Sequence, residues 1–276
     1  MSTLPKISVV TPSFNQAEYL EDTIRSVLSQ DYPNLEYIVM DGGSTDGSAD
    51  IIKRHVGNLT HWQSEPDGGQ PSAINAGMSR ATGDLVTFIN SDDLLEPGSL
   101  LAVAAAHGKA RSDVYYGNHF KIDHHGSRLH CVYHAPWVNW VAWRTRPYLA
   151  QPGTFITRAL WNRVGGVDET LACCFDTDFW YRCLSAGARF HRIPAPLASF
   201  RLHPESKGVS ERWQVRYRAE QDAIFSRYLE GTHPVSRRIA RASLTLAQIG
   251  LGNYQRRLLS TVWNRHAPTL IRHWVR

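Results

Sequence analysis

The chain has 276 residues, of which 42% are hydrophobic and 20% are charged, a composition typical of globular rather than disordered proteins. Its length fits one large α/β domain with an appendage, or two modest domains. No apolar run approaches the roughly 20 residues that a membrane-spanning helix needs. The N-terminus also lacks the basic and then apolar layout of a secretory signal. We therefore expect a cytoplasmic protein.

The formal net charge of +5 hides an asymmetry along the chain. Residues 201–276 hold 14 Lys and Arg against 5 Asp and Glu, whereas the first 200 residues hold 16 against 20. A basic tail on an acidic body predicts an anionic partner, and on charge alone this is either anionic lipid or nucleic acid. The tail contains no recognised nucleic-acid-binding module, so we do not expect a nucleic-acid partner.

The cysteines form no CxxC pair and no disulfide framework; they are Cys131, Cys173, Cys174 and Cys183. A reduced compartment is the simpler interpretation. We expect small core residues and no zinc site.

Over the first hundred residues, short runs of β-forming residues alternate with helical patterns. Buried strands are predicted at 7–14, 35–41, 59–65 and 84–90. Helices are predicted after a capping-box spacing at 15–18, over the short run 49–55, and over 71–81 with a proline near its start. Strands separated by helices over short connections predict an α/β fold with a doubly wound parallel sheet.

The second half of the chain continues with a predicted helix over 99–110 and a strand over 113–118. Residues 119–134 resemble a hairpin that turns at 123–127. From about Glu211 the pattern is helical and basic to the C-terminus.

Polar residues follow the predicted strands, at 11–15, 41–44, 65–67 and 90–93. In open parallel sheets, ligands bind beyond the carboxyl ends of the strands. We therefore expect the site at this edge of the sheet.

Two adjacent acids, Asp92 and Asp93, end the fourth predicted strand. Mg²⁺ and Mn²⁺ prefer such oxygen ligands, usually together with substrate phosphates. The alternative is that the acids cap the next helix. Asp41, at the second strand end, is a candidate acceptor for hydrogen bonds from a base or a ribose, and Asp46 is a candidate helix cap.

Longer motifs make the pattern specific. "ISVVTPSFNQAEYLEDTIRSVLSQDYPNLEYIVMDGGSTDGSADII" and "SEPDGGQPSAINAGMSRATGDLVTFINSDD" resemble the nucleotide-sugar-binding half of the family 2 glycosyltransferases. The resemblance resumes at "QPGTFITRALWNRVGGVDETLACCFDTDFWYRCLSAGARFHRI" and "FRLHPESK". It implies an inverting enzyme of the GT-A fold, with a mostly parallel sheet flanked by helices and a C-terminal helical extension. The implied organisation is a GT-A domain over 1–210, divided into a nucleotide-sugar-binding half (1–100) and an acceptor half (101–210), followed by an extension over 211–276.

The resemblance also implies roles for residues of the first half. Asp41 would contact the base, Asp93 would hold a metal that bridges the diphosphate, and Asp92 would lie nearer the ribose. Two positions depart from the pattern, because Asn90 and Ser72 stand where many members have acids. The predicted nucleotide-sugar-binding residues are Thr11, Pro12, Ser13, Asn15, Asp41, Gly43, Asp67, Gln70, Asn75 and Asp92.

In the second half, Asp176 aligns with the base of the family, although Phe175 replaces the preceding acid. An inverting transfer needs such a base to take the proton of the acceptor hydroxyl. Helix capping is the alternative for Asp176 and the role we expect for Asp178. His203 resembles a histidine that closes over the diphosphate or completes the metal shell, with surface packing as the alternative.

Arg201 and Lys207 are either phosphate partners or solvated charges. The tryptophans Trp137, Trp140 and Trp143 fit sugar stacking or a lipid interface, but core packing is expected for at least two of them. Acceptor contacts are predicted for Gln151 and Trp180.

The implied function is transfer of a sugar, with a UDP-sugar favoured as donor, to a hydroxyl of a glycan or lipid-linked acceptor, with Mg²⁺ or Mn²⁺ as cofactor. The alternatives are a sugar-nucleotidyltransferase, whose glycine-rich basic loop is missing from "TPSFNQAEYL", and a non-catalytic nucleotide-binding scaffold. The basic extension would either lie on the inner face of an anionic membrane or form the outer face of an ordinary helical packing.

Overall fold

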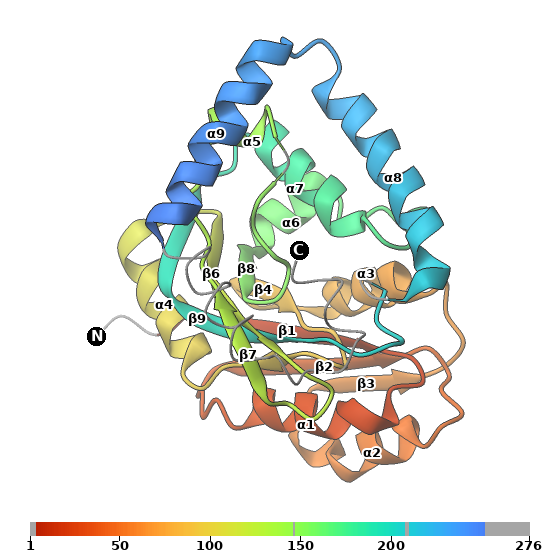
Figure 1. Ribbon diagram of the computed structural model, residues 1–276. Coiled ribbons are helices and arrows are strands. Elements are labelled where there is room, and N and C mark those ends of the chain that lie inside the picture. The colour runs from red at the N-terminus through yellow and green to blue at the C-terminus, as the bar shows by residue number, and fades with distance from the viewer. Residues whose placement is uncertain (1–3, 146, 208–209, 252–276) are drawn as a thin grey trace.

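The computed structural model of the chain describes residues 4–145, 147–207 and 210–251 (Figure 1). The strands are β1 (Ile7–Ser13), β2 (Leu35–Asp41), β3 (His61–Ser64), β4 (Leu85–Phe88), β5 (Leu94–Leu95), β6 (Val114–Ile122), β7 (Arg128–Val132), β8 (Thr154–Thr157) and β9 (Phe190–Arg201). The helices are α1 (Ala17–Leu28), α2 (Ser48–Arg54), the 3-10 turn η1 (Val56–Asn58), α3 (Gln70–Arg80), α4 (Ser99–Ala110), α5 (Asn139–Ala142), α6 (Arg158–Val164), α7 (Phe175–Ser185), α8 (Glu211–Leu229) and α9 (Pro234–Gly250).

The strands form one sheet in the order β3-β2-β1-β4-β8-β6-β9-β5, and β7 pairs with β6. The pairs among β1, β2, β3 and β4 are parallel. β8 enters antiparallel between β4 and β6, and β9 is again parallel to β6. The predicted α/β class with a largely parallel sheet is confirmed, and the second half of the sheet is mixed.

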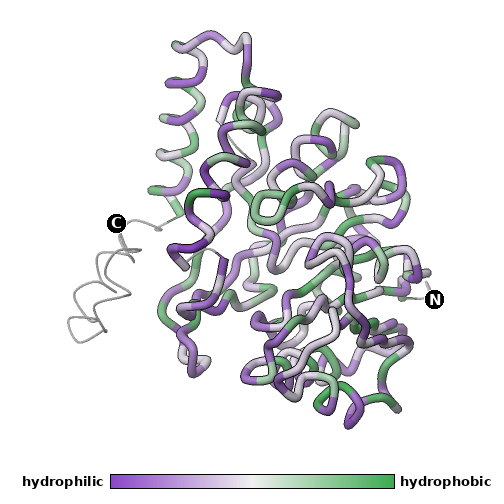
Figure 2. Tube along the Cα trace, turned by 90° about the vertical axis from the view of Figure 1, so that its right-hand side faces the viewer, coloured by the Kyte–Doolittle hydropathy of each residue, from purple (hydrophilic) through white to green (hydrophobic). Residues whose placement is uncertain are grey.

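The C-terminal helices are α8 and α9, as predicted, while the remainder of the predicted extension, 252–276, lies outside the described residues. α8 contacts α7, and α9 contacts α5. Ile224 and Leu229 of α8 share a buried cluster with Cys174 and Tyr181, so α8 packs into the body of the molecule. Along α9, hydrophobic and hydrophilic segments alternate (Figure 2). No helix in the described ranges is both long and apolar enough to cross a bilayer.

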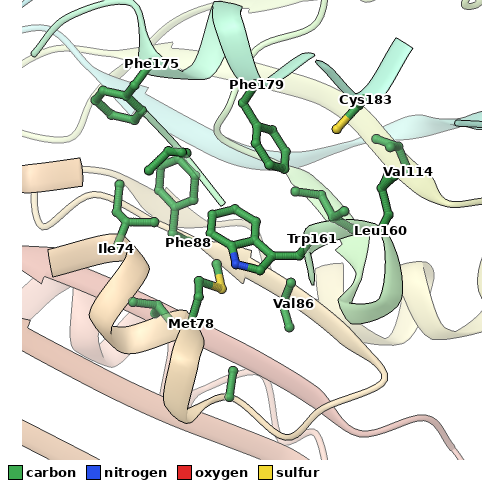
Figure 3. Packing of buried hydrophobic residues seen from close by; sticks show 14 of the residues in the cluster. Ile74, Met78, Val86, Phe88, Val114, Leu160, Trp161, Phe175, Phe179 and Cys183 are labelled. Atoms are coloured by element: carbon green, nitrogen blue, oxygen red, sulfur yellow. The ribbon is translucent and has the colours of Figure 1, made fainter. Parts of the chain in front are cut away.

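The sheet buries a different set of side chains on each face, because successive residues of a strand point to opposite sides. Val9 and Val39 pack on the side of α1, α2 and α4. Val10 and Met40 face α3, α6 and α7, where Trp161 and Phe179 complete the core (Figure 3). All cysteines are free thiols: two are buried in these clusters and two are half-buried, in keeping with the predicted packing role.

The start of α1 differs from the predicted capping box. Gln16 occupies the N-cap position and makes no capping bond with its side chain. Instead, Asp46 accepts a hydrogen bond from the N–H of Ala17 at 2.8 Å, and Ser48 Oγ accepts from the N–H of Gln16 at 3.1 Å. The prediction was wrong because the cap comes from the loop after β2, which a local pattern does not reveal.

The predicted hairpin is formed by β6 and β7. Its turn is closed by the Asp123 carboxylate, which accepts hydrogen bonds from the N–H groups of His125 and Ser127 at 3.0 and 2.9 Å. Gly126 adopts a φ of 87°, a conformation that favours glycine.

Candidate functional site

The carboxyl ends of the first strands lie in register, as the strand-end pattern predicted. Ser13 pairs with Asp41 across β1 and β2, and Asp41 pairs with Ser64 across β2 and β3. β4 lies on the other side of β1 and ends at Phe88, two residues before Asn90. Polar side chains from four separate loops therefore share one edge of the sheet.

The Asp41 carboxylate fastens the loop after β2 to the sheet. It is 1% exposed and accepts hydrogen bonds from Ser44 Oγ at 2.5 Å, from the Ser44 N–H at 2.9 Å and from Ser64 Oγ at 2.6 Å. Asn15 joins the same loop, since its N–H donates to Ser44 Oγ at 2.8 Å and its side-chain oxygen accepts from the Thr45 N–H at 2.9 Å. These two residues, which the sequence predicted as ligands, thus fix the conformation of the loop after β2.

Gly43 belongs to the same loop and requires glycine. Its φ is 79°, and a Cβ there would lie 2.9 Å from the backbone nitrogen of Pro66. The loop after β2 therefore lies tightly against the loop after β3.

The three predicted residues at the end of β1 have different surroundings. Thr11 is fully buried, and its hydroxyl lies 3.0 Å from the hydroxyl of Tyr37. Pro12 is also buried. Ser13 is 4% exposed, and its hydroxyl has no hydrogen-bond partner among the described residues. Because unpartnered buried polar groups are rare in proteins, Ser13 is the side chain of this strand end with hydrogen-bonding capacity to spare.

The two adjacent acids at the end of β4 point in different directions. Asp93 is fully buried and accepts hydrogen bonds from the N–H of Arg201 at 3.0 Å and from Asn90 Nδ2 at 3.2 Å. Desolvation, together with the neighbouring charge of Asp92, raises the pKa of Asp93 well above its ordinary value. Asp92 remains 18% exposed and lies 2.9 Å from Nε2 of His203. The burial of Asp93 does not fit the predicted metal contact, whereas the surroundings of Asp92 do.

The donor set at Asp92 and His203 fits a divalent cation of the Mg²⁺ or Mn²⁺ class. A carboxylate oxygen and an imidazole nitrogen meet here, and both are ligands that Mn²⁺ accepts. Among the described residues, no group of three or more His, Cys, Asp or Glu side chains is arranged to hold a metal. Two protein ligands are enough when the substrate diphosphate and water supply the others.

Arg201 holds both acids in place from the end of β9. Its Nε donates to the carbonyl oxygen of Asp92 at 2.8 Å, and its side chain is 1% exposed. The guanidinium also reaches Asp22 at 3.4 Å and lies over the ring of Tyr19. This enclosed position does not fit the predicted contact with phosphate.

A chain of hydrogen bonds connects the Asp93 region with the segment before α7. Asn90 Oδ1 accepts from Gln70 Nε2 at 2.7 Å, and Gln70 Oε1 accepts from Lys207 Nζ at 2.7 Å. Lys207 also donates to the carbonyl oxygen of Ala172 at 2.8 Å. Within the described ranges Lys207 has no acidic partner within 4 Å, and desolvation lowers its pKa. A half-buried cation with only neutral partners favours an incoming anion.

Asp176 lies at the start of α7, next to the end of β4. The preceding residue, Phe175, is buried, with its ring centroid 6.2 Å from that of Phe88 (Figure 3). Asp176 is partly exposed, and Oδ1 accepts hydrogen bonds from the N–H and hydroxyl of Thr177 at 2.6 and 3.3 Å. Desolvation raises the pKa of Asp176, and the bonds from Thr177 only partly oppose this. A carboxyl group with a raised pKa is suited to accept a proton.

Asp178 has a different role from the predicted helix cap. It is 1% exposed and bonds to Arg182 Nε at 2.7 Å, to the Tyr228 hydroxyl at 3.1 Å and to Arg227 at 3.2 Å. The prediction was wrong because the side chain turns away from the helix start and binds α7 to α8. The two acids of this helix therefore differ in environment, one partly exposed and one enclosed by cations.

Glu220 of α8 is a residue that the sequence did not single out. Its carboxylate accepts hydrogen bonds from the N–H groups of Ala172, Cys173 and Cys174 at 2.8, 2.8 and 3.0 Å, and from Arg216 Nε at 2.8 Å. Burial opposes its ionisation, but these donors lower its pKa. Glu220 thus fixes the backbone that leads into α7. In the sequence, the feature that could have identified Glu220 is an acidic residue within a largely basic helical segment.

The other predicted nucleotide-sugar residues lie around the start of α3. Asp67 is exposed and accepts from the Gly69 N–H at 2.7 Å. The side chain of Asn75 is fully engaged in hydrogen bonds. Its Nδ2 donates to the carbonyl oxygen of Val167 at 2.9 Å and to the Glu169 carboxylate, and its Oδ1 accepts from the N–H of Val167 at 3.0 Å. Glu169, in the loop after α6, also accepts a hydrogen bond from the Ser72 hydroxyl.

On the predicted acceptor side, Gln151 and Trp180 are both enclosed. Gln151 is 7% exposed and donates to the Phe88 carbonyl, while its side-chain oxygen has no partner among the described residues. Trp180 is 2% exposed and packs in the core against Phe179, and its indole N–H also has no hydrogen-bond partner among the described residues.

Two of the three neighbouring tryptophans pack against other aromatic side chains, as expected, and the third is exposed. Trp137 stacks on Phe190, and Trp143 packs near Tyr181. Trp140 is 41% exposed.

The fold resembles those of several solved structures. S. aureus TarS 1–349 in complex with UDP-GlcNAc has a TM-score of 0.64 at 21% identity, over 81% of this chain and 71% of that one. The mannosyltransferase PcManGT from Pyrobaculum calidifontis, in complex with GDP-Man and Mn²⁺, has a TM-score of 0.59 at 21% identity, over 99% of this chain and 84% of that one. At these identities the likeness concerns the fold alone, and it confirms the expected GT-A architecture.

Sequence comparison identifies the family of the chain. The uncharacterized glycosyltransferase Rv1514c of Mycobacterium tuberculosis is 38% identical over 120 residues, which cover 42% of this chain and 46% of the relative. The hyaluronan synthase of Pasteurella multocida is 28% identical over 76% of this chain and 22% of its own. The chain thus spans less than half the length of these relatives. The sequence model described as Glycosyl transferase family 2 matches residues 8–165, more than half of the chain. The chain therefore belongs to glycosyl transferase family 2.

Proposed function

We propose that the protein transfers a sugar from a nucleoside diphosphate donor to a hydroxyl acceptor, with inversion at the anomeric carbon. The observation that carries this proposal is the chain of hydrogen bonds from Asp93 through Asn90 and Gln70 to Lys207. It connects the acids at the end of β4 with the segment that leads to Asp176. This connection supports the proposal that a donor site and a proton acceptor lie side by side, as a displacement between two substrates requires.

For the donor, we propose that Asp92 and His203 hold the divalent cation, in place of the assignment to Asp93. Lys207 would face the diphosphate, and Ser13 would donate its spare hydroxyl to the nucleotide. When bound, the cation would stabilise the negative charge of the departing nucleoside diphosphate. A UDP-sugar is our first choice of donor, because the TarS neighbour was solved with UDP-GlcNAc. The PcManGT complex makes GDP-mannose the second.

For the chemistry, we propose Asp176 as the general base. The acceptor oxygen forms a bond to the anomeric carbon while the bond from that carbon to the phosphate oxygen breaks. The proton of the acceptor hydroxyl passes to the Asp176 carboxylate, whose raised pKa brings its basicity closer to neutral pH. Gln151 remains our candidate for acceptor contacts, because its side-chain oxygen has spare capacity beside Phe88. The proposed acceptor is a glycan or a lipid-linked sugar on the cytoplasmic side of a membrane.

Thermal-shift measurements with UDP and GDP, each with and without Mn²⁺, test the donor site. A ligand at 100 times its Kd stabilises the folded state by about 2.7 kcal/mol. We expect a shift that requires both nucleotide and metal, and we expect Asp92→Asn to lose it. Asp50→Asn is the matched control, because Asp50 is 74% exposed and, among the described residues, its carboxylate forms an ion pair with Lys53 alone, at 2.9 Å. No shift with any nucleoside diphosphate, or an unchanged shift in Asp92→Asn, would contradict the proposed site.

A second measurement separates transfer from the alternatives. Release of UDP from a UDP-sugar in the presence of hydroxyl acceptors is expected for the wild type and not for Asp176→Asn, which should still bind the nucleotide. Pyrophosphate release from UTP and a sugar phosphate would instead identify a sugar-nucleotidyltransferase. Nucleotide binding without either product would identify a non-catalytic scaffold.

A further inference from the structure

A cavity of about 370 Å³ lies between helices α8 and α9, which diverge from the turn that joins them (Figure 1). Apolar side chains of both helices line it: Phe225 and Leu229 of α8, and Leu244 of α9. Arg237 and Arg241 of α9 line it as well, and none of the described lining residues is acidic. Its volume falls within the range of cavities that bind small molecules.

The cavity is apolar toward the body of the molecule and cationic toward solvent. Leu229 is 4% exposed and belongs to the buried cluster that joins α7 and α8, and Phe225 packs against the same cluster. Leu244 and Arg237 are half-buried, whereas Arg241 is exposed. A molecule that enters from solvent therefore meets a charged group before it reaches the apolar wall.

The two arginines of the cavity are neighbours on one face of α9, because residues four positions apart in an α-helix lie one above the other. Like charges at this spacing repel each other. Within the described ranges neither Arg237 nor Arg241 forms an ion pair with an acidic group within 4 Å, and α9 itself contains no acidic residue. One anion bound between the two guanidinium groups would relieve this repulsion. Guanidinium groups favour phosphate, which they bind through paired hydrogen bonds.

The lining selects an occupant that is both anionic and apolar. A small anion would pair with the arginines but leave the apolar wall in contact with water, and a neutral hydrocarbon would bury that wall but leave the arginines unpaired. Residues 252–276, which lie outside the described ranges, contain no Asp or Glu, so their side chains cannot neutralise the arginines. A lipid phosphate meets both requirements in one molecule.

We propose that this cavity binds a single lipid phosphate, with the phosphate between Arg237 and Arg241 and the adjoining hydrocarbon chain against Phe225, Leu229 and Leu244. The binding needs neither nucleotide nor metal and is therefore independent of the proposed sugar transfer.

Isothermal titration calorimetry of the full chain tests this proposal, with decyl phosphate kept below its critical micelle concentration. We expect decyl phosphate to bind at least about tenfold more tightly than inorganic phosphate or the neutral amphiphile decyl maltoside. The double variant Arg237→Gln/Arg241→Gln should bind decyl phosphate at least about tenfold more weakly, because it loses hydrogen bonds between charged groups. Arg238→Gln is the matched control, since Arg238 is exposed and does not line the cavity.

A second variant tests the apolar wall separately. Leu244→Asn should weaken the binding of decyl phosphate and leave that of inorganic phosphate unchanged, and thermal melting followed by circular dichroism checks that each variant is folded.

Four results would overturn the proposal. Equal binding of inorganic phosphate and decyl phosphate would indicate a site for a small anion, and equal binding of decyl maltoside would show that the arginines do not select the ligand. Equal weakening by Arg238→Gln would indicate a general effect of charge. Binding to vesicles of phosphatidic acid without binding of monomeric decyl phosphate would assign the arginines to a bilayer surface instead of a single lipid.

Discussion

Asp176 and Asp178 lie two residues apart on α7, and the structure predicts opposite consequences for their removal. Asp178 is 1% exposed and pairs with Arg182 at 2.7 Å and Arg227 at 3.2 Å. Removing one partner of a buried ion pair costs about 3–5 kcal/mol. Because Arg227 is 60% exposed and its attraction is screened by water, we expect Asp178→Ala to cost about 3 kcal/mol, or roughly 6–12 °C in Tm.

Asp176→Asn should leave stability unchanged or slightly higher. Burial raises the pKa of Asp176, so the folded state carries a penalty for its ionised form above that pKa, and a neutral amide removes this penalty. Transfer should nevertheless fall about 10²–10⁴-fold, the usual contribution of a general base. Urea unfolding and a UDP-release assay measure the two effects. A loss of stability in Asp176→Asn with wild-type transfer would refute the assignment of the two acids.

Three further predictions follow from the same site. The rate of transfer should fall as the pH drops through the pKa of Asp176, which burial raises above the ordinary value of about 3.9 for an aspartate. The pH–rate profiles of the wild type and of Asp176→Glu should both show this loss of activity on the acidic side. A loss of activity centred on the ordinary value would contradict the prediction. Glu220→Ala removes the acceptor of three N–H groups, so urea unfolding should report a loss of about 3 kcal/mol and kinetics a lower kcat with little change in donor KM. Lys207→Met should weaken UDP binding about tenfold by calorimetry, whereas the exposed control Lys53→Met should not.

Much of the fold follows from local pattern. The alternation of Val9 with Val10 on β1, and of Val39 with Met40 on β2, places one side chain on each face of the sheet. The same sequence that predicts these strands also places polar residues directly after them, and parallel strands bring those ends to one edge. The shared edge of polar residues that forms the candidate site was therefore predictable without coordinates. The antiparallel entry of β8 between β4 and β6 was not, because strand partners are chosen by contacts distant in sequence.

The role of each side chain was less predictable. Adjacent acids such as Asp92 and Asp93 look alike in a sequence, yet one is enclosed by Arg201 and Asn90 while the other faces His203. The predicted cap at the start of α1 failed for a related reason, since its acceptors come from another loop.

The amino-acid sequence by itself determined the class of fold and the edge of the sheet that carries polar residues, because these depend on periodicity along the chain. Its resemblance to the family 2 glycosyltransferases added Asp176 as the candidate base. Only the tertiary structure decided that Asp92 is the acid that remains accessible and that Glu220 supports the segment before α7. Burial, and the hydrogen bonds that compensate for it, depend on groups that folding brings together from distant parts of the chain.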